Sequence, residues 1–237
     1  MEPITNEINQ EINLTFGEKL KYFFIKPGKV FAQFLEKPKY LGNMLVLAVI
    51  TCITSVMGSI AAKGVMDEIL DKQTQGLDPA AAQMSKGIAN VMTSPAVAVI
   101  GGLVGLVVGI YVSSAIYFGL AKLFKGEGTY TQMVAVYVLA HYPLVIGKFI
   151  STVYSVAVKK TIADPNKAVG FGDVIINALN VFGIWRMVIF AIGISVVFKI
   201  SKKKSATIVI LIWAIGLIFS LISVGFAQAM QNIVPAQ

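Results

Sequence analysis

Three basic side chains lie inside long apolar runs of this sequence: His141, Lys148 and Arg186. In hydrocarbon such groups are costly unless they have a partner, a water-filled cavity or a function. His141 shares a predicted helical face with Tyr137, four residues earlier, and with Lys148, seven residues later. We take Tyr137, His141, Lys148 and Arg186 as a candidate polar site in the membrane, which could bind a lipid or ligand or gate a path.

A structural role for His141 is the competing interpretation. Pro143 removes one backbone donor and frees the carbonyl near Leu139, so a helix bend is expected there. A neutral His141 hydrogen-bonded to a carbonyl or hydroxyl of a neighbouring helix would then only pack the bundle. Counted from the ends of the spans, His141 lies about 15 Å deep, and Lys148 and Arg186 lie nearer the far interface, where they can reach headgroups.

Several kinds of chemistry are disfavoured by the residues outside this set. All twelve carboxylates fall outside the apolar runs, whereas proton- and cation-coupled transporters usually hold an acidic group at membrane depth. The sequence contains no nucleophile elbow, no H-E-x-x-H and no phosphate-binding loop. One histidine and one cysteine, Cys52, make neither a metal cluster nor an intramolecular disulfide. We therefore expect no catalytic, metal or cofactor-binding residues and no enzyme activity.

The elements that must position the candidate site are membrane-spanning helices. Of the 237 residues, 56% are hydrophobic and only 14% are charged, and the mean hydropathy is +0.76. Soluble proteins average about 45 to 50% apolar and about 25% charged residues. The sequence predicts an all-α polytopic membrane protein with a cytoplasmic segment over residues 1–40 and a membrane domain over 41–237. Its five spans are expected at about 41–62, 96–121, 132–158, 181–198 and 206–227.

The segment before the first span is predicted to be an amphipathic arm on the membrane surface. Thr15 and Glu18 fit the capping box of a helix start. A second short helix is expected to follow Pro27 and to end before Pro38, with Val30, Phe31, Phe34 and Leu35 on its apolar side. Beyond the first span, Asp78 and Pro79 predict a further short helix lying on the membrane.

A ridge of small residues runs along the second span, at Gly101, Gly105, Gly109 and Ser113. Such ridges let two helix backbones approach closely. Packing within the chain, against Thr51, Ser55 and Ser59 of the first span, is the favoured interpretation, and a homodimer seam is the alternative.

The lysines predict the orientation of the chain. Twelve precede the first span or lie between spans two and three and between spans four and five, against six in the connections on the other side. Lysine-rich short loops stay in the cytoplasm, so we expect a cytoplasmic amino terminus and an external carboxyl terminus. The net charge of +8 is then mostly lysine beside anionic headgroups and needs no nucleic-acid partner.

Three stretches suggest a family: KPGKVFAQFLEKP in the arm, the turn GEGTYTQ, and IWRMVIFAIGISVVFKISKKKS before the last span. The chain resembles the Yip family of integral membrane proteins, named for interaction with Ypt/Rab GTPases, in a compact bacterial form. The most specific part is the turn holding Gly128, Thr129, Tyr130 and Gln132, followed by Tyr137 and Pro143. The resemblance implies five spans with a cytosolic amino terminus. In eukaryotes it implies roles in vesicle budding through Rab proteins, but the motifs of those members are absent here.

Together these observations predict a scaffold or accessory protein of the bacterial plasma membrane. It would bind other integral membrane proteins, such as an ABC exporter or a membrane-trafficking partner, and anionic lipid, through its helical faces, with a homo-oligomer as a further option. The alternatives are a passive channel or carrier whose path runs beside the His141 stripe, and a lipid-handling protein that depends on Arg186 or Lys148.

Overall fold

The computed structural model describes residues 15–158 and 169–233, so the predicted polar segment at residues 1–14 lies outside the described residues. The described chain contains helices and no strand, which confirms the all-α prediction. In chain order the helices are α1 (Phe16–Ile25), α2 (Pro27–Ala32), α3 (Leu41–Gln73), α4 (Pro79–Met92), α5 (Pro95–Leu123), α6 (Tyr130–Ala140), α7 (Tyr142–Val158), α8 (Phe171–Ala178), α9 (Val181–Val197) and α10 (Lys202–Ile233).

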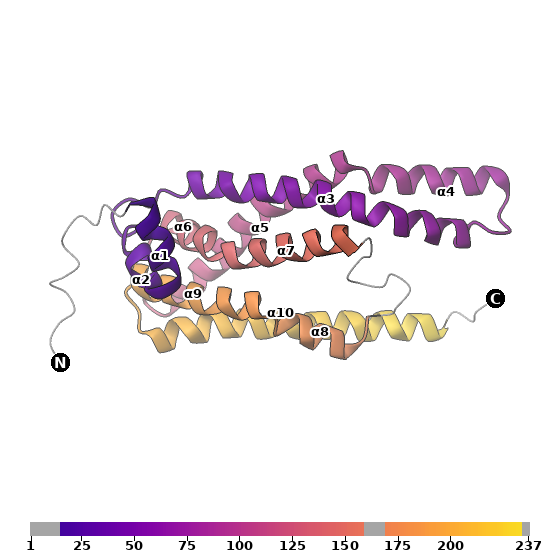
Figure 1. The fold of residues 1–237 in the computed structure, drawn as a ribbon. Helices are drawn as coiled ribbons and strands as arrows, with labels where there is room; N and C mark the ends of the chain where they lie inside the picture. The colour runs from indigo at the N-terminus through magenta and orange to yellow at the C-terminus, as the bar shows by residue number, and fades with distance from the viewer. Residues whose placement is uncertain (1–14, 159–168, 234–237) are drawn as a thin grey trace, which may run out of the picture.

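Helix α6 is the centre of the fold (Figure 1). It packs against α5 and α9, and every residue from Met133 to Ala140 is buried. On one side α3 packs against α5 and α7, and on the other α9 packs against α10. A helix buried all round must find its partners inside the protein, so α6 joins the two halves of the bundle.

Four helical segments in the described chain are long and apolar enough to cross a membrane alone: Leu41–Lys63, Pro95–Leu123, Tyr130–Val158 and Lys202–Ala229. A fifth crossing requires α8 and α9 together, which meet at a bend of 47°. The 17 residues of α9 rise about 25 Å, less than a core of about 30 Å. The fourth predicted span thus coincides with α9, which is too short to cross alone and completes a crossing only if α8 extends it through the bend.

The third span is interrupted where the sequence predicted a bend. A turn at His141 separates α6 from α7, and Pro143 is the second residue of α7. The His141 amide donates to the Val138 carbonyl, at 3.2 Å, instead of continuing the regular helical ladder. The missing proline donor and this tightened turn explain the break.

The connection after the first span is a helical hairpin. Helix α3 continues to Gln73, beyond its apolar window, and α4 begins at Pro79 with Asp78 as its amino-terminal cap, as predicted. Lys86 of α4 forms an ion pair with Asp71 of α3, with 2.7 Å between nitrogen and oxygen. In Figure 1 α4 runs alongside the distal part of α3 rather than across the direction of the spans, so the prediction of a helix lying on the membrane is wrong there.

The amino-terminal arm is docked on the bundle through one side. The capping box of Thr15 and Glu18 is present at the start of α1. Val30, Phe31 and Phe34 are buried, and α2 packs against α9. Leu20 and Phe24 of α1 remain more than half exposed, at 54% and 59%. The apolar side of the second arm helix thus faces protein, while part of the first stays available to lipid.

The small-residue ridge does not pack as predicted. A side chain added at Gly101, Gly105 or Gly109 would meet nothing within 4 Å. The close approach is instead at Gly102, where an added Cβ would lie 2.6 Å from Ser55 Oγ and 3.3 Å from Thr51 Cγ2. One residue corresponds to about 100° of helix rotation, so α5 presents the face beside the ridge to α3. The sequence identified the correct partner residues on α3 and the wrong glycines on α5.

Candidate functional site

The guanidinium of Arg186 is held against aromatic rings near the middle of the bundle. Its central carbon lies 4.9 Å from the centroid of the Tyr137 ring and 5.9 Å from that of Phe190. Arg186 is on α9, whose backbone rises about 16 Å between this residue and Val197 at its end. Arginine stays charged in proteins, and both rings offer it the negative face of their quadrupole.

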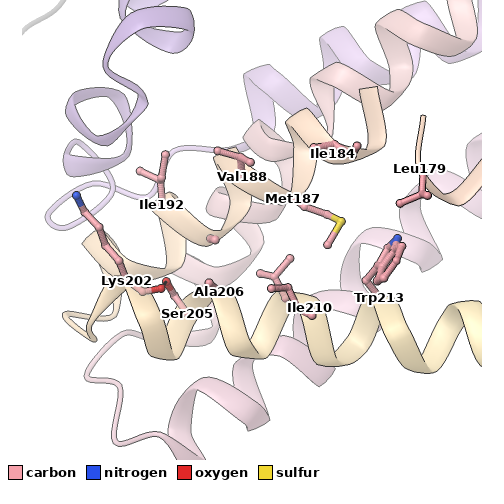
Figure 2. A pocket seen from close by; sticks show the side chains of 12 residues that line it. Leu179, Ile184, Met187, Val188, Ile192, Lys202, Ser205, Ala206, Ile210 and Trp213 are labelled. Carbon is pink, nitrogen blue, oxygen red and sulfur yellow. Dashed lines mark hydrogen bonds between the residues drawn. The ribbon is translucent and has the colours of Figure 1, made fainter. Parts of the chain in front are cut away.

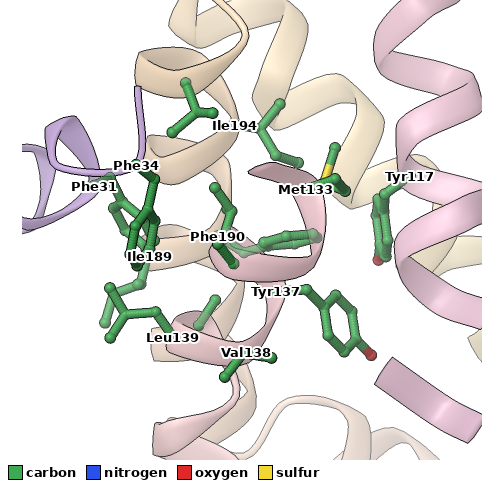
Figure 3. Packing of buried hydrophobic residues seen from close by; sticks show 14 of the residues in the cluster. Phe31, Phe34, Tyr117, Met133, Tyr137, Val138, Leu139, Ile189, Phe190 and Ile194 are labelled. Carbon is green, nitrogen blue, oxygen red and sulfur yellow. The ribbon is translucent and has the colours of Figure 1, made fainter. Parts of the chain in front are cut away.

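Tyr117 of α5 completes an aromatic cluster with Tyr137 and Phe190. The Tyr117 and Phe190 rings meet edge to face, with centroids 4.6 Å apart, and the Tyr137 and Phe190 rings do so at 5.4 Å. Figure 3 shows the three side chains converging from α5, α6 and α9. All three residues are buried, so the position of Arg186 is fixed by a packed wall rather than by a mobile loop.

His141 belongs to this group through Tyr137, whose ring centroid is 5.7 Å from that of His141. In the described structure the buried Nδ1 of His141 has no hydrogen-bond partner. The expected hydrogen bond from His141 to a neighbouring helix is therefore absent at this nitrogen. The position of His141 at the helix break is as predicted, and its side chain extends the cluster rather than bracing the bend.

Lys148 is not part of the group. It is exposed on α7 and makes no contact with the cluster. The seven-residue spacing that aligned it with His141 holds only for a continuous helix, and the turn at His141 interrupts that helix. The structure thus brings together Tyr137, His141 and Arg186 of the four predicted residues and leaves Lys148 apart.

A cleft of about 600 Å³ opens beside Arg186, between α5, α8, α9 and α10. Its lining includes several polar side chains besides the guanidinium. The polar lining comprises Arg186, Tyr117, Tyr137, Asn177, Ser113 and Ser220. The rest of the wall is apolar and includes Val174, Ile212 and Leu217. The cleft is therefore amphipathic, with one fixed positive charge.

No acidic group among the residues that the structure describes balances this charge. Arg186 forms no ion pair within the part of the chain that the structure describes, and its buried Nε has no hydrogen-bond partner there. The same residues contain no group of His, Cys, Asp and Glu side chains close enough to hold a metal ion. An unpaired cation beside a cleft favours an anionic ligand over a metal ion or a proton relay.

The turn between α5 and α6 has a structural role that its sequence did not reveal. Added Cβ atoms at Gly126 and Gly128 would lie 3.0 Å and 2.8 Å from the Phe198 ring. The Glu127 amide donates to the Phe198 carbonyl at 3.0 Å, and Glu127 pairs with Lys199 at 3.0 Å. This turn therefore packs tightly against the turn between α9 and α10 and is hydrogen-bonded to it.

The same turn also holds the amino-terminal arm. Thr129 and Gln132 form a capping box at the start of α6. The side-chain amide of Gln132 donates to the carbonyls of Phe34 and Leu35, at 3.1 Å and 2.9 Å. The Tyr130 hydroxyl donates to the Tyr111 carbonyl at 2.9 Å. Three lysine-rich segments thus meet at one end of the bundle: the arm, the turn between α5 and α6, and the turn between α9 and α10. The residues that connect them are Gly128, Thr129, Tyr130 and Gln132.

Three further residues that line the cleft were not recognised from the sequence: Tyr117, Phe190 and Trp213. Each looks like an ordinary apolar span residue, and only its neighbours from other helices give it a role. Trp213 donates its indole N–H to the Ala178 carbonyl at 3.3 Å, which anchors the break between α8 and α9 to α10. The one signal available in the sequence was that three spans each hold an aromatic residue with a polar tip, namely Tyr117, Tyr137 and Trp213.

Comparison with known proteins gives two findings. The family model for the Yip1 domain matches residues 21–224. The chain is also similar to Membrane protein YknW of Bacillus subtilis (strain 168), with 26% identity over 231 residues that cover 92% of this chain and 96% of the relative. No solved structure matches the chain.

Proposed function

We propose that this chain, which belongs to the Yip1-domain family of integral membrane proteins, is a non-enzymatic accessory protein that binds other membrane proteins. An ABC exporter and a membrane-trafficking component are the partners that we consider. The lysine-rich end would lie on the cytoplasmic side of a bacterial plasma membrane.

The observation that carries the proposal is the exposed apolar side of α4. None of its residues is buried. Met84, Ile88 and Met92 recur at helical spacing and are 68%, 55% and 66% exposed. Because α3 continues about 15 Å past Lys63, this hairpin extends beyond the apolar window of the span. Methionine-rich apolar faces on a helix are suited to binding a partner helix or groove.

The ridge on α5 provides a second surface. Gly101 and Gly105 are exposed and make no close contact within the chain. Small residues at this spacing allow another transmembrane helix to approach. A partner with both a span and a domain next to the membrane could use the two surfaces together.

Site-specific photo-crosslinking in native membranes tests the proposal. A photoreactive residue at Ile88 or at Gly105 should each yield a crosslink to a discrete integral membrane protein, identified by mass spectrometry. A matched probe at Asn90, which is exposed on the opposite side of α4, should not. Identical crosslinks from Ile88 and Asn90, or only self-crosslinks, would contradict a role in binding a different protein.

The conductor alternative has less support. A path beside the His141 stripe needs polar side chains along one continuous face, and Lys148 lies apart from Tyr137 and His141. The purified protein in vesicles should therefore produce no flux of small solutes. Flux that is lost in His141→Leu, with the amount of folded protein unchanged, would favour the conductor over the accessory role.

A further inference from the structure

The charge of Arg186 needs a ligand that the described chain does not supply. The guanidinium has aromatic rings on one side and the cleft on the other, and no carboxylate within the described residues pairs with it. A ring face attracts a cation but leaves guanidinium N–H groups without acceptors. An anionic group in the cleft would accept those hydrogen bonds.

The shape and lining of the cleft select an amphiphile over a small soluble anion. Arg186 and Ser113 provide donors in the lining, while Ile212 and Leu217 provide apolar surface. The walls from α5 and α10 belong to apolar windows long enough to cross a membrane. The molecules that surround such a cleft are lipids, which carry a phosphate and acyl chains in the same molecule.

An apolar groove of about 370 Å³ lies between α9 and α10, next to the cleft. The two hollows share Met187, Val209 and Trp213. Figure 2 shows Met187 and Ile210 facing each other across the groove, with Trp213 beside them. The surface next to the positive charge is therefore suited to acyl chains.

We propose that this cleft is a binding site for an anionic phospholipid, whose headgroup phosphate pairs with Arg186 while an acyl chain lies on the apolar wall of α10. The site is independent of the accessory role, because it uses neither α4 nor Gly101 and Gly105 of the α5 ridge; only Ser113, at the far end of that ridge, lines the cleft. Phosphate and guanidinium match in charge and in bidentate geometry. Ser113 supplies a further hydroxyl to the lining, whereas the Ser220 hydroxyl already donates to the Gly216 carbonyl at 2.9 Å.

Trp213 provides an internal probe, since it lines both hollows and the chain has only one other tryptophan, Trp185. In a Trp185→Phe background, Trp213 fluorescence is measured in phosphatidylcholine vesicles that contain a small fraction of doxyl-labelled phosphatidylglycerol. Doxyl-labelled phosphatidylcholine at the same fraction gives the quenching by general surrounding lipid. We expect phosphatidylglycerol to be preferred by about tenfold, as for one charge-assisted contact.

Two variants test the assignment of the site. Arg186→Gln should reduce the preference to about one, since it removes the charge. Gly216→Leu fills the cleft from α10 at a position where an added Cβ meets nothing within 4 Å, and it should have the same effect with the charge retained. Gly58→Leu is the matched control, because Gly58 also has open space but lies on α3, away from the cleft, and it should keep the preference.

The outcomes separate clearly. Loss of the preference in Gly216→Leu but not in Gly58→Leu supports the site even if Arg186→Gln fails to fold. Equal quenching by the two lipids in the unsubstituted protein would overturn the proposal. Displacement of the quenching by millimolar inorganic phosphate would also overturn it, since the cleft would then take a soluble anion and not a lipid.

Discussion

The guanidinium of Arg186 on α9 lies over the ring of Tyr137 on α6, with 4.9 Å between its central carbon and the ring centroid. This contact joins α6, which is buried from Met133 to Ala140, to α9. We expect Tyr137→Leu to lower the free energy of unfolding by about 1 to 2 kcal/mol, because the cation loses its ring face. Tyr137→Phe keeps that face and should stay within about 0.5 kcal/mol of the original.

Thermal unfolding in detergent measures both variants. A double-mutant cycle with Arg186→Gln isolates the contact between the two side chains. A coupling energy near zero would show that Tyr137 acts through its packing with Phe190 and Tyr117 instead of through Arg186.

Gly128 is pressed against the Phe198 ring, where an added Cβ would lie 2.8 Å from ring carbons. Gly128→Ala should therefore cost about 1 to 3 kcal/mol of stability, as expected for overpacking. Gly119→Ala is the control, since Gly119 has open space in α5 and should gain up to about 1 kcal/mol from helix propensity. Equal melting temperatures for the two variants would contradict the close packing at the turn.

Gln132 secures the arm through its side-chain amide, which donates to the Phe34 and Leu35 carbonyls. Gln132→Glu keeps an oxygen to accept from the Thr129 amide but loses the donor, so the cap should survive and the arm should loosen. The cost is about 1 to 3 kcal/mol for two carbonyls left without a partner. Limited trypsin digestion should cut faster at Lys29, which precedes Val30, and Gln83→Glu, an exposed glutamine on α4, should not change the rate.

The two faces of α5 should respond differently to a large residue. Gly102→Leu collides with Ser55 and Thr51 and should destabilise the protein by about 1 to 3 kcal/mol. Gly105→Leu meets open space and should leave stability unchanged while it weakens the binding of a partner helix. If Gly105→Leu alone lowers the melting temperature of the purified protein, the ridge packs within the chain or against a second copy.

The two described ends of the chain lie at opposite ends of the bundle in Figure 1, as five crossings require. A reporter that is active only outside the cytoplasm should therefore be active when fused after Gln237. The physical reason is the excess of lysine around α1, α2 and the turn before α10, which we expect to keep that end on the cytoplasmic side. A reporter that works only in the cytoplasm at this position would rule out the five-span topology.

The sequence by itself determined the composition-dependent features of this protein. Apolar runs predicted the helices that cross the membrane, Thr15 and Glu18 predicted the cap of α1, and Pro143 predicted the break in the third span. These features depend on hydropathy, on local hydrogen bonds and on a missing donor, so residues near one another in the chain decide them. The absence of carboxylates from the four long apolar segments likewise followed from the sequence alone, whereas Asp173 lies in α8, the first helix of the bent pair.

Only the tertiary structure decided which side chains meet. Periodicity aligned Lys148 with His141 and selected Gly101 over Gly102, because it assumes a continuous helix and says nothing of how one helix is rotated against another. The cleft beside Arg186 depends on Tyr117, Phe190 and Trp213, which come from three different helices. In a membrane most helical faces are apolar, so pattern does not separate a face that contacts lipid from one that contacts protein, and packing alone makes that choice.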